Sequence, residues 1–287
     1  MSSRAPAATL SALVAARLLD APLAGLAWLL VERGVPVVVA GRESAVVDAL
    51  LDALVAALPP DRRPDPVVGL AGNRLVGLAG NRLVRVAGCL DTDTPPGILR
   101  AALAATTGRS GLALAITAND LAGVLSVLRS QGLTDDEISF MGVVLVLGRR
   151  DAGAAGDRQP DGAPDGGDAA RLGASDGGDA ARLGASDGGD AARLVAAHYL
   201  RPVVLDAGGH PRRLAPAILA TWDPAAVAWD DFSWGITPDL AERTRLRAGD
   251  LERERERRAA LIAAHAHGGS GHADHALAGH APDRPVG

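Results

Sequence analysis

The sequence predicts an α/β fold in which helices cover a mainly parallel sheet. Short valine- and leucine-rich runs bounded by glycine are typical of strands buried on both faces, and segments with helical spacing of apolar residues alternate with them. Such alternation implies parallel strands joined by crossover helices. Of the 287 residues 48% are hydrophobic but only 2% are aromatic, so alanine, valine and leucine must fill the core.

The first strand–turn–helix unit lies before residue 60. Residues 35–40 are a valine-rich run that predicts a strand. Pro36 cannot donate a ladder hydrogen bond, so regular pairing should start at Val37. A turn begins at Gly41, and residues 46–58 predict a helix that stops at a Pro-Pro pair. Two helices are expected upstream, over residues 10–19 and 23–31.

The same pattern continues to residue 147 and returns after residue 193. Strands are predicted over residues 82–87, 112–116 and 143–147, and helices over residues 96–105, 121–130 and 134–141. Thr134 and Glu137 have the spacing of a capping box, which marks the start of the last of these helices. Residues 194–204 return to strand-like composition, and residues 238–245 and 250–265 predict closing helices.

Composition divides the chain into five parts. These are a core over residues 1–150, a flexible Asp/Gly-rich insert over 151–192, returning strands and an aromatic-rich segment over 193–235, C-terminal helices over 236–266, and a disordered histidine-rich tail over 267–287. The insert repeats DGGDAARL from Asp165, Asp176 and Asp187, and GLAGNRLV occurs from Gly69 and again from Gly77. A solenoid would need each repeat to bury a continuous core, which a unit with one leucine cannot do, so an expanded surface loop is preferred.

Two clusters have both a structural and a functional interpretation. The aromatic residues Trp222, Trp229, Phe232 and Trp234 are interpreted as a hydrophobic plug on the surface rather than a platform for a ligand. The histidines of the tail could capture Zn²⁺ or Ni²⁺ weakly, but a tail without a physiological metal is favoured. We therefore expect no metal site.

Charge, cysteine content and hydropathy exclude several classes of protein. The net charge of −5 argues against a nucleic-acid-binding domain, and a single cysteine, Cys89, rules out an intramolecular disulfide and a multi-cysteine metal site. No signal-peptide pattern begins the chain, and the apolar stretch of residues 21–40 is interrupted by Glu32 and Arg33. A cytoplasmic protein without direct membrane insertion is expected.

The turn from Gly41 has the context of a phosphate-binding loop but not its chemistry. Such a loop, G-x-x-x-x-G-K-[ST], wraps phosphates with backbone N–H groups, neutralises them with lysine and ligates Mg²⁺ through a hydroxyl. Here Val46 stands at the second glycine, Val47 at the lysine and Asp48 at the Ser/Thr position. All 29 basic residues of the chain are arginine, so no lysine elsewhere could substitute.

Three segments together resemble the P-loop ATPases that power type II/type IV secretion and pilus assembly. VPVVVAGRESAVVDALLDAL resembles their P-loop region, VRVAGCLDTDTPPGILRAAL their Walker B segment, and GLALAITANDLAGVLSVLR their His box. Order and approximate spacing also match, over residues 23–205. The resemblance implies a three-layer RecA-like P-loop domain, here with a flexible insert and a helical C-terminal extension.

Carried over position by position, the family's functional residues are missing. The vestigial P-loop comprises Gly41, Arg42, Glu43, Ser44, Ala45, Val46, Val47 and Asp48. In the Walker B segment Gly88 is kept, but Cys89 stands at the catalytic glutamate and Asp91 at the arginine position. In the His box Thr117 replaces the histidine. The resemblance thus implies no catalytic residue, because the groups that stabilise transition-state charge and position water are all replaced.

Three functions follow from these substitutions. The first is a non-hydrolysing ATPase-like protein without a cofactor that acts on secretion or pilus-assembly proteins, with an active ATPase paralogue as one candidate partner. The second is an active ATPase that binds ATP and Mg²⁺ with unorthodox residues, in which Arg42, Arg85 or a neighbouring subunit's arginine replaces the lysine. The third is an α/β scaffold outside this family that needs no nucleotide.

Overall fold

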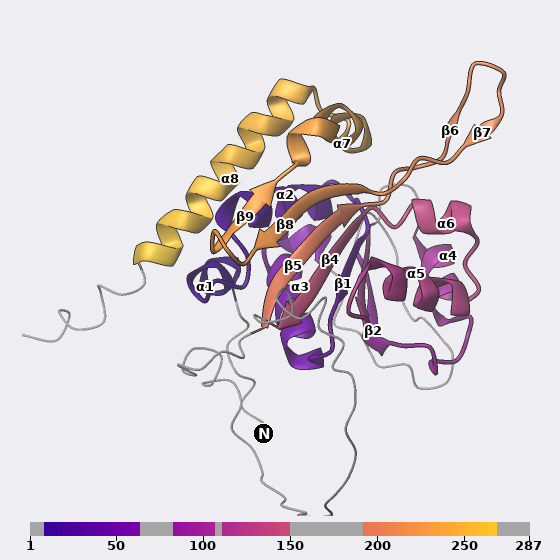
Figure 1. The fold of residues 1–287 in the computed structure, drawn as a ribbon, viewed down its shortest axis with the longest axis horizontal. Coiled ribbons are helices and arrows are strands. Elements are labelled where there is room, and N and C mark those ends of the chain that lie inside the picture. The colour runs from indigo at the N-terminus through magenta and orange to yellow at the C-terminus, as the bar shows by residue number, and fades with distance from the viewer. Residues whose placement is uncertain (1–8, 64–82, 107–110, 150–191, 269–287) are drawn as a thin grey trace, which may run out of the picture.

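The computed structural model describes residues 9–63, 83–106, 111–149 and 192–268 of the chain (Figure 1). Within these ranges one seven-stranded mixed sheet forms the centre, in the order β2-β3-β1-β4-β5-β8-β9. Its strands are β1 (Val37–Ala40), β2 (Val84–Leu90), β3 (Leu112–Ile116), β4 (Val143–Arg149), β5 (Ala192–Tyr199), β8 (Ala217–Asp223) and β9 (Ala228–Asp231). The expected α/β fold is therefore present.

The sheet has a parallel half and an antiparallel half. Strand β1 pairs in parallel with β3 on one side and with β4 on the other, and β2 pairs in parallel with β3. Strands β1 and β3 and the first five residues of β4 are buried and consist of valine, leucine, isoleucine and alanine, as expected when helices cover both faces. Strands β5, β8 and β9 extend this sheet by antiparallel pairing.

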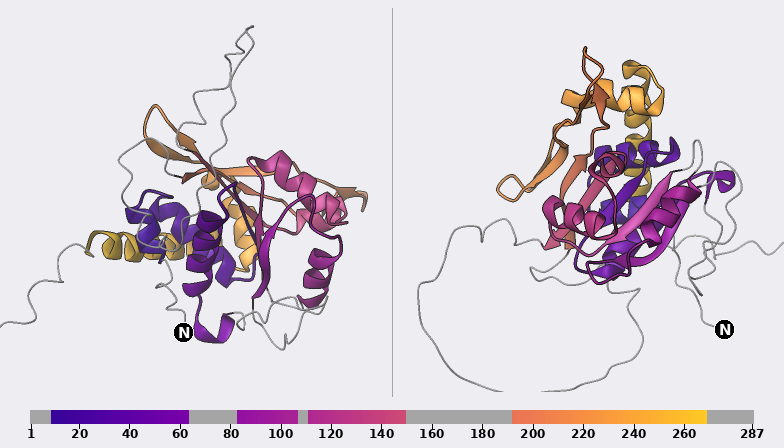
Figure 2. Two further views of the ribbon diagram at one scale, coloured as in Figure 1. Left: turned by 90° about the horizontal axis from the view of Figure 1, so that it is seen from below. Right: turned by 90° about the vertical axis from the view of Figure 1, so that its right-hand side faces the viewer.

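Helices cover both faces of the sheet and make three layers (Figure 2). One face carries α1 (Leu10–Ala15), α2 (Ala21–Glu32), α3 (Ser44–Ala56), α7 (Thr237–Thr244) and α8 (Ala248–Gly268). The other face carries α4 (Ile98–Ala105), α5 (Leu121–Ser130) and α6 (Asp135–Ser139). Short 3-10 turns lie at Pro60–Arg62 and Ser233–Ile236. Because side chains alternate along a strand, Val37 and Val39 face the first layer and Val38 the second.

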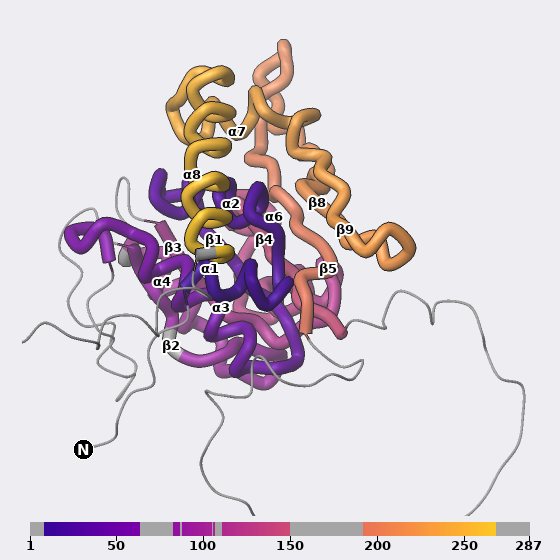
Figure 3. Tube along the Cα trace, turned by 90° about the vertical axis from the view of Figure 1, so that its left-hand side faces the viewer, coloured from indigo at the N-terminus to yellow at the C-terminus, as the bar shows by residue number. Residues whose placement is uncertain are grey.

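The long helix α8 is held against the N-terminal helices (Figure 3). A side chain at Gly25 of α2 would lie 2.9 Å from the backbone nitrogen of Ala259, so glycine permits this close approach of two helices. Arg258, only 4% exposed, is paired with Glu32 at 2.7 Å and with Glu254 at 2.8 Å, and it stacks over the ring of Trp28. The extension is thus part of the packed structure, not an appendage.

The predicted elements are largely confirmed. Strand β3 and helix α5 have the predicted bounds, regular pairing of β1 starts at Val37, and the capping box of Thr134 and Glu137 is formed. Helix α3 begins at Ser44, two residues before the predicted start. Strand β2 extends to Leu90, three residues beyond its predicted end, through a bulge at which Gly88 has a positive φ.

Two features of the C-terminal half were not predicted. Strands β8 and β9 form a hairpin, and β6 (Val204–Leu205) with β7 (Pro211–Arg212) forms a second one that projects from the body (Figure 1). Strand β5 begins at Ala192, a residue that the sequence assigned to the flexible insert. The remainder of the insert and nearly all of the histidine-rich tail lie outside the described residues.

The aromatic segment divides into a packed pair and an exposed pair. The rings of Trp222 and Trp229 meet edge to face with centroids 4.6 Å apart, and the guanidinium of Arg193 lies 3.7 Å over Trp222. By contrast, Phe232 and Trp234 are exposed, Trp234 to 75%. The expected surface plug therefore describes the first pair only. None of the described helices is long and apolar enough to cross a membrane.

Candidate functional site

The carboxyl ends of the parallel strands bring the predicted site residues together. The backbone N–H of Gly41, after β1, donates to the carbonyl of Ile116 at 3.1 Å, and that of Thr117, after β3, donates to Leu90 at 2.8 Å. The thiol of Cys89 lies 3.2 Å from the hydroxyl of Thr117. Residues from three separate sequence segments thus meet at one edge of the sheet.

This edge contains a topological switch point. The connection from β1 leads through α3 to β2 on one side of the sheet, whereas the connection from β3 leads through α5 and α6 over β1 to β4 on the other side. Ligands of open α/β sheets bind in the crevice that such a reversal leaves between two strands. Here the side chain of Arg42 donates to Asn119 Oδ1 at 2.6 Å and bridges that crevice.

The turn after β1 is too short to wrap a phosphate group. Only Gly41, Arg42 and Glu43 separate the last residue of β1 from the first residue of α3. Since α3 begins at Ser44, Val46 and Val47 already lie inside its first turn, where their N–H groups bond to the carbonyl of Glu43. Ser44 and Ala45 are the exposed start of the helix and not part of a loop. A phosphate-binding loop needs several free N–H groups in a wider turn.

Residue 47, which aligns with the lysine of the phosphate-binding pattern, belongs to the core. Val47 is fully buried and packs against Gly41, where an added Cβ would lie 2.9 Å from Val47 Cγ2 and 3.1 Å from Leu147 Cβ. Gly41 is not among the residues with a positive φ, so close packing rather than a special backbone conformation requires glycine there. A lysine at residue 47 would place its charge inside the core.

Asp48 is paired with an arginine of a neighbouring strand. Arg85 of β2 forms ion pairs with Asp48, at 3.5 Å, and with Asp52 one turn further along α3. On the other side of the turn, Glu43 is 3.9 Å from Arg149. Both acidic residues of the predicted P-loop segment, Glu43 and Asp48, therefore have arginine partners.

Cys89 and Asp91 have opposite pKa shifts with local causes. Burial raises the pKa of the Cys89 thiol, and the nearby carboxylates of Asp48 and Asp91 raise it further, against the hydrogen bond from Thr117. Hydrogen bonds from Thr94 lower the pKa of Asp91, whose carboxylate accepts the Thr94 hydroxyl at 2.7 Å. A thiol with a raised pKa is a poor nucleophile. In the described ranges no group of three or more His, Cys, Asp or Glu side chains could hold a metal ion.

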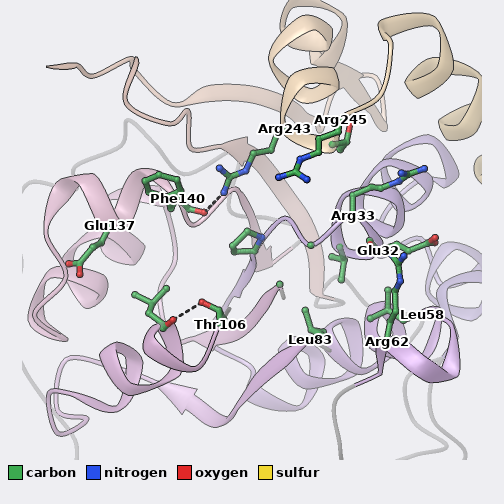
Figure 4. Close-up of a pocket in the computed structure, with 16 residues that line it drawn as sticks. Glu32, Arg33, Leu58, Arg62, Leu83, Thr106, Glu137, Phe140, Arg243 and Arg245 are labelled. Atoms are coloured by element: carbon green, nitrogen blue, oxygen red, sulfur yellow. Dashed lines mark hydrogen bonds between the residues drawn. The ribbon is translucent and has the colours of Figure 1, made fainter. Parts of the chain in front are cut away.

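A cavity of about 660 Å³ lies elsewhere, at the amino-terminal ends of the same strands (Figure 4). Sequence reasoning placed no site there. The basic segment around Arg243 and Arg245 was the available signal, but it was assigned only to a closing helix.

Comparison with known proteins adds no relative. No family model matches the chain, and no curated protein matches it. The α/β class with its mixed sheet is what the coordinates establish.

Proposed function

We propose that the chain is a degenerate ATPase-like protein of the secretion and pilus-assembly type, which does not hydrolyse ATP and acts through protein partners. The observation that carries the proposal is the turn of Gly41, Arg42 and Glu43, followed by a buried Val47 where a phosphate-binding lysine would stand. Catalysis of phosphoryl transfer depends on positioned charge, which this turn lacks.

The arrangement of the motif segments supports an ATPase-like ancestry. Each segment that resembles a P-loop, Walker B or His-box region contains one strand and the turn after it, and these strands are β1, β2 and β3. The three strands are parallel and end at the same edge of the sheet. At that edge Cys89 and Thr117 are neighbours, as the residues that they replace would have to be in order to act on one nucleotide. A three-layer RecA-like domain is the finer fold that this arrangement favours.

The active alternative requires an arginine to replace the missing lysine. Arg42 is hydrogen-bonded to Asn119, and Arg85 is paired with Asp48 and Asp52. Each would have to give up these partners to bind a phosphate. That cost favours the non-hydrolysing protein over an ATPase with unorthodox residues.

Turnover and binding of Mg-ATP test the proposal. We expect the purified chain to release no phosphate above the uncatalysed rate, and calorimetry to detect no Mg-ATP binding that depends on Arg42. The variants Arg42→Ala and Arg243→Gln are titrated in parallel, because the second changes only the opposite edge of the sheet. Turnover, or binding that is lost in Arg42→Ala alone, would establish the active ATPase instead.

Action through partners has a separate test. An active secretion ATPase encoded in the same genome is assayed with and without an equimolar amount of this chain. We expect its rate of ATP hydrolysis to change, and the change to disappear when the two proteins are separated. An unchanged rate and no complex on a sizing column would contradict this part of the proposal and favour a nucleotide-independent scaffold.

A further inference from the structure

The cavity at the amino-terminal edge is built from the residues that precede the parallel strands. Three lining residues stand immediately before β1, β2 and β3, namely Pro36, Leu83 and Gly111. The end of α7 closes the cavity from the C-terminal half of the chain. Its volume of about 660 Å³ falls within the range of pockets that bind small molecules.

Arg243 in the last turn of α7 and Arg245, which caps this helix, give the cavity a positive charge. Figure 4 shows the side chains of Arg243 and Arg245 extending from the end of the helix toward the pocket. Arg243 donates to the carbonyl of Phe140 at 3.0 Å and has no carboxylate partner among the described residues. Arg245 makes no side-chain hydrogen bond or ion pair in the described part of the chain. Two neighbouring guanidinium groups without a counter-ion attract an anion.

The acidic residues that line the cavity are already neutralised. Glu32 forms the ion pair with the buried Arg258. The carboxylate of Glu137 accepts the backbone N–H of Thr134 at 2.7 Å in the capping box, and it lies 3.4 Å from Arg100. Neither carboxylate is therefore available to Arg243 or Arg245, and the positive charge of the cavity remains uncompensated.

The backbone at Arg245 is strained. Its φ is +57°, in the left-handed region at the C-terminus of α7, where glycine is the usual residue. Strained residues cluster at functional sites, and of the three described non-glycine residues with a positive φ, which are Arg17, Val227 and Arg245, only Arg245 lines this cavity. Arg245 supplies its side chain to the cavity.

The rest of the lining is apolar. Val31, Leu58, Leu83 and Leu103 contribute to the wall, and Phe140 is 51% exposed while the guanidinium of Arg243 lies 5.3 Å over its ring. A ring and aliphatic side chains beside a pair of arginines fit a ligand with one anionic end and one apolar body.

We propose that this cavity binds a small organic phosphate with an apolar or aromatic body. The guanidinium forks of Arg243 and Arg245 hold the phosphate, and the body lies against Phe140 and the leucines. Phosphate is favoured over carboxylate because a doubly charged group with three acceptor oxygens satisfies two guanidinium forks at once. The inference is independent of the proposed function, since no residue of the carboxyl edge contributes to it.

Titration with 1-naphthyl phosphate, followed by calorimetry on the full chain, tests the proposal. We expect a dissociation constant below about 1 mM, weaker binding as salt increases, and affinity at least tenfold lower for 1-naphthoate and 1-naphthol. Arg243→Gln and Arg245→Gly should each lower the affinity for 1-naphthyl phosphate by about tenfold or more. Arg42→Ala, at the opposite edge, should leave it unchanged.

The two cavity variants are chosen so that misfolding cannot imitate the result. Arg245→Gly removes the strain at a left-handed position, so it should fold at least as well as the native chain. No binding of 1-naphthyl phosphate at 10 mM would overturn the proposal. So would equal affinity for 1-naphthol, which would indicate an apolar pocket only, or tighter binding of 1-naphthoate, which would indicate a carboxylate site. Loss of binding in Arg42→Ala instead would move the phosphate site to the carboxyl edge.

Discussion

The two ends of the parallel strands differ in how their charged side chains are satisfied. At the carboxyl ends the polar groups bind one another: Arg42 binds Asn119, Arg85 pairs with Asp48, and Thr117 bonds to Cys89. At the amino-terminal ends Arg243 and Arg245 line a cavity without a carboxylate partner in the described ranges. At the carboxyl edge, where open α/β sheets usually bind ligands, the polar side chains are thus paired with one another. At the amino-terminal edge the two arginines remain available to a ligand.

This difference shows that the fold alone does not locate a ligand site. A switch point lies at the carboxyl edge and predicts a ligand there, but a short turn and internal pairing leave nothing with which to bind it. Uncompensated charge beside a cavity is the stronger signal, because side chains that already have partners must lose them before they bind a ligand.

The largest expected effect comes from placing a lysine at residue 47. Val47→Lys should lower the free energy of unfolding by about 3 kcal/mol or more, because the ammonium group would lie in the core without a partner. Urea unfolding measures the change. Ala45→Lys is the matched control, since Ala45 is exposed on the same helix, and its effect should stay within about 0.5 kcal/mol. If Val47→Lys instead kept its stability and bound Mg-ATP, the turn would be a repairable phosphate loop.

Arg245→Gly should stabilise the chain by about 1 kcal/mol, because glycine adopts a positive φ without the clash of a Cβ atom. Arg245→Ala separates strain from charge, since it removes the guanidinium but keeps the Cβ, and it should leave stability nearly unchanged. Thermal unfolding at low salt compares the three proteins. Equal stability of the glycine and alanine variants would mean that the strain is absent and would remove one support of the anion site.

A smaller effect should appear in the pH dependence of stability. The pKa of Glu254 is lowered from 4.5 to about 2, first by the hydrogen bond from Arg257 and then by that from Arg258. A lowered pKa stabilises the fold at pH values above 4.5, and this contribution is lost as the pH falls from 4.5 toward 2. We expect it to amount to less than about 1 kcal/mol, because the side chain of Arg257, the partner with the largest effect, is 55% exposed.

Glu254→Gln isolates this contribution. It should lower stability at pH 7 and flatten the decline between pH 4.5 and 2, as measured by urea unfolding at a series of pH values. The result bears on the cavity at the amino-terminal edge, because Glu32 lines this cavity and shares Arg258 with Glu254. An unchanged pH profile would mean that Arg257 and Arg258 do not lower the pKa of Glu254.

The parallel half of the fold could be predicted from the sequence, and the antiparallel half could not. Buried parallel strands are continuous apolar runs, so residues 112–116 and 143–147 were clear in the sequence. Strands β8 and β9 contain tryptophan, aspartate and alanine with one face exposed, and their pairing depends on a partner strand and not on local pattern. The projecting hairpin has two-residue strands, too short to leave a periodic signal.

The duplications show a second limit of local pattern. The third DGGDAARL copy ends in Arg193 and Leu194, which are buried in β5, and the second GLAGNRLV copy ends in Val84, the first residue of β2. The end of a repeat is therefore part of a core strand in both cases. The pattern within the repeat does not reveal this, because pairing with a neighbouring strand makes these residues part of the sheet.

The sequence placed the candidate residues after separate strands, and the fold brings them to one edge of the sheet. Gly41, Cys89 and Thr117 lie there close to one another. Sequence spacing did not reveal that α3 starts at Ser44, because Ser44 and Ala45 fit either a loop or a helix start. Nor could it reveal the cavity, whose lining comes from distant segments joined only by the fold.

The smallest expected effect is that of Arg42→Ala. This variant tests whether the hydrogen bond to Asn119 is all that keeps a nucleotide from the carboxyl edge. The hydrogen bond from Arg42 to Asn119 lies at an exposed position, so its loss should change the free energy of unfolding by less than about 0.5 kcal/mol. Asn119→Ala serves as the reciprocal control and should give the same value, since both variants remove one contact. A loss above about 1 kcal/mol in both would make the bridge a structural brace of the crevice. A small loss together with new Mg-ATP binding would show that only this bridge excludes nucleotide, and the contrast between the two edges would then rest on a single exposed side chain.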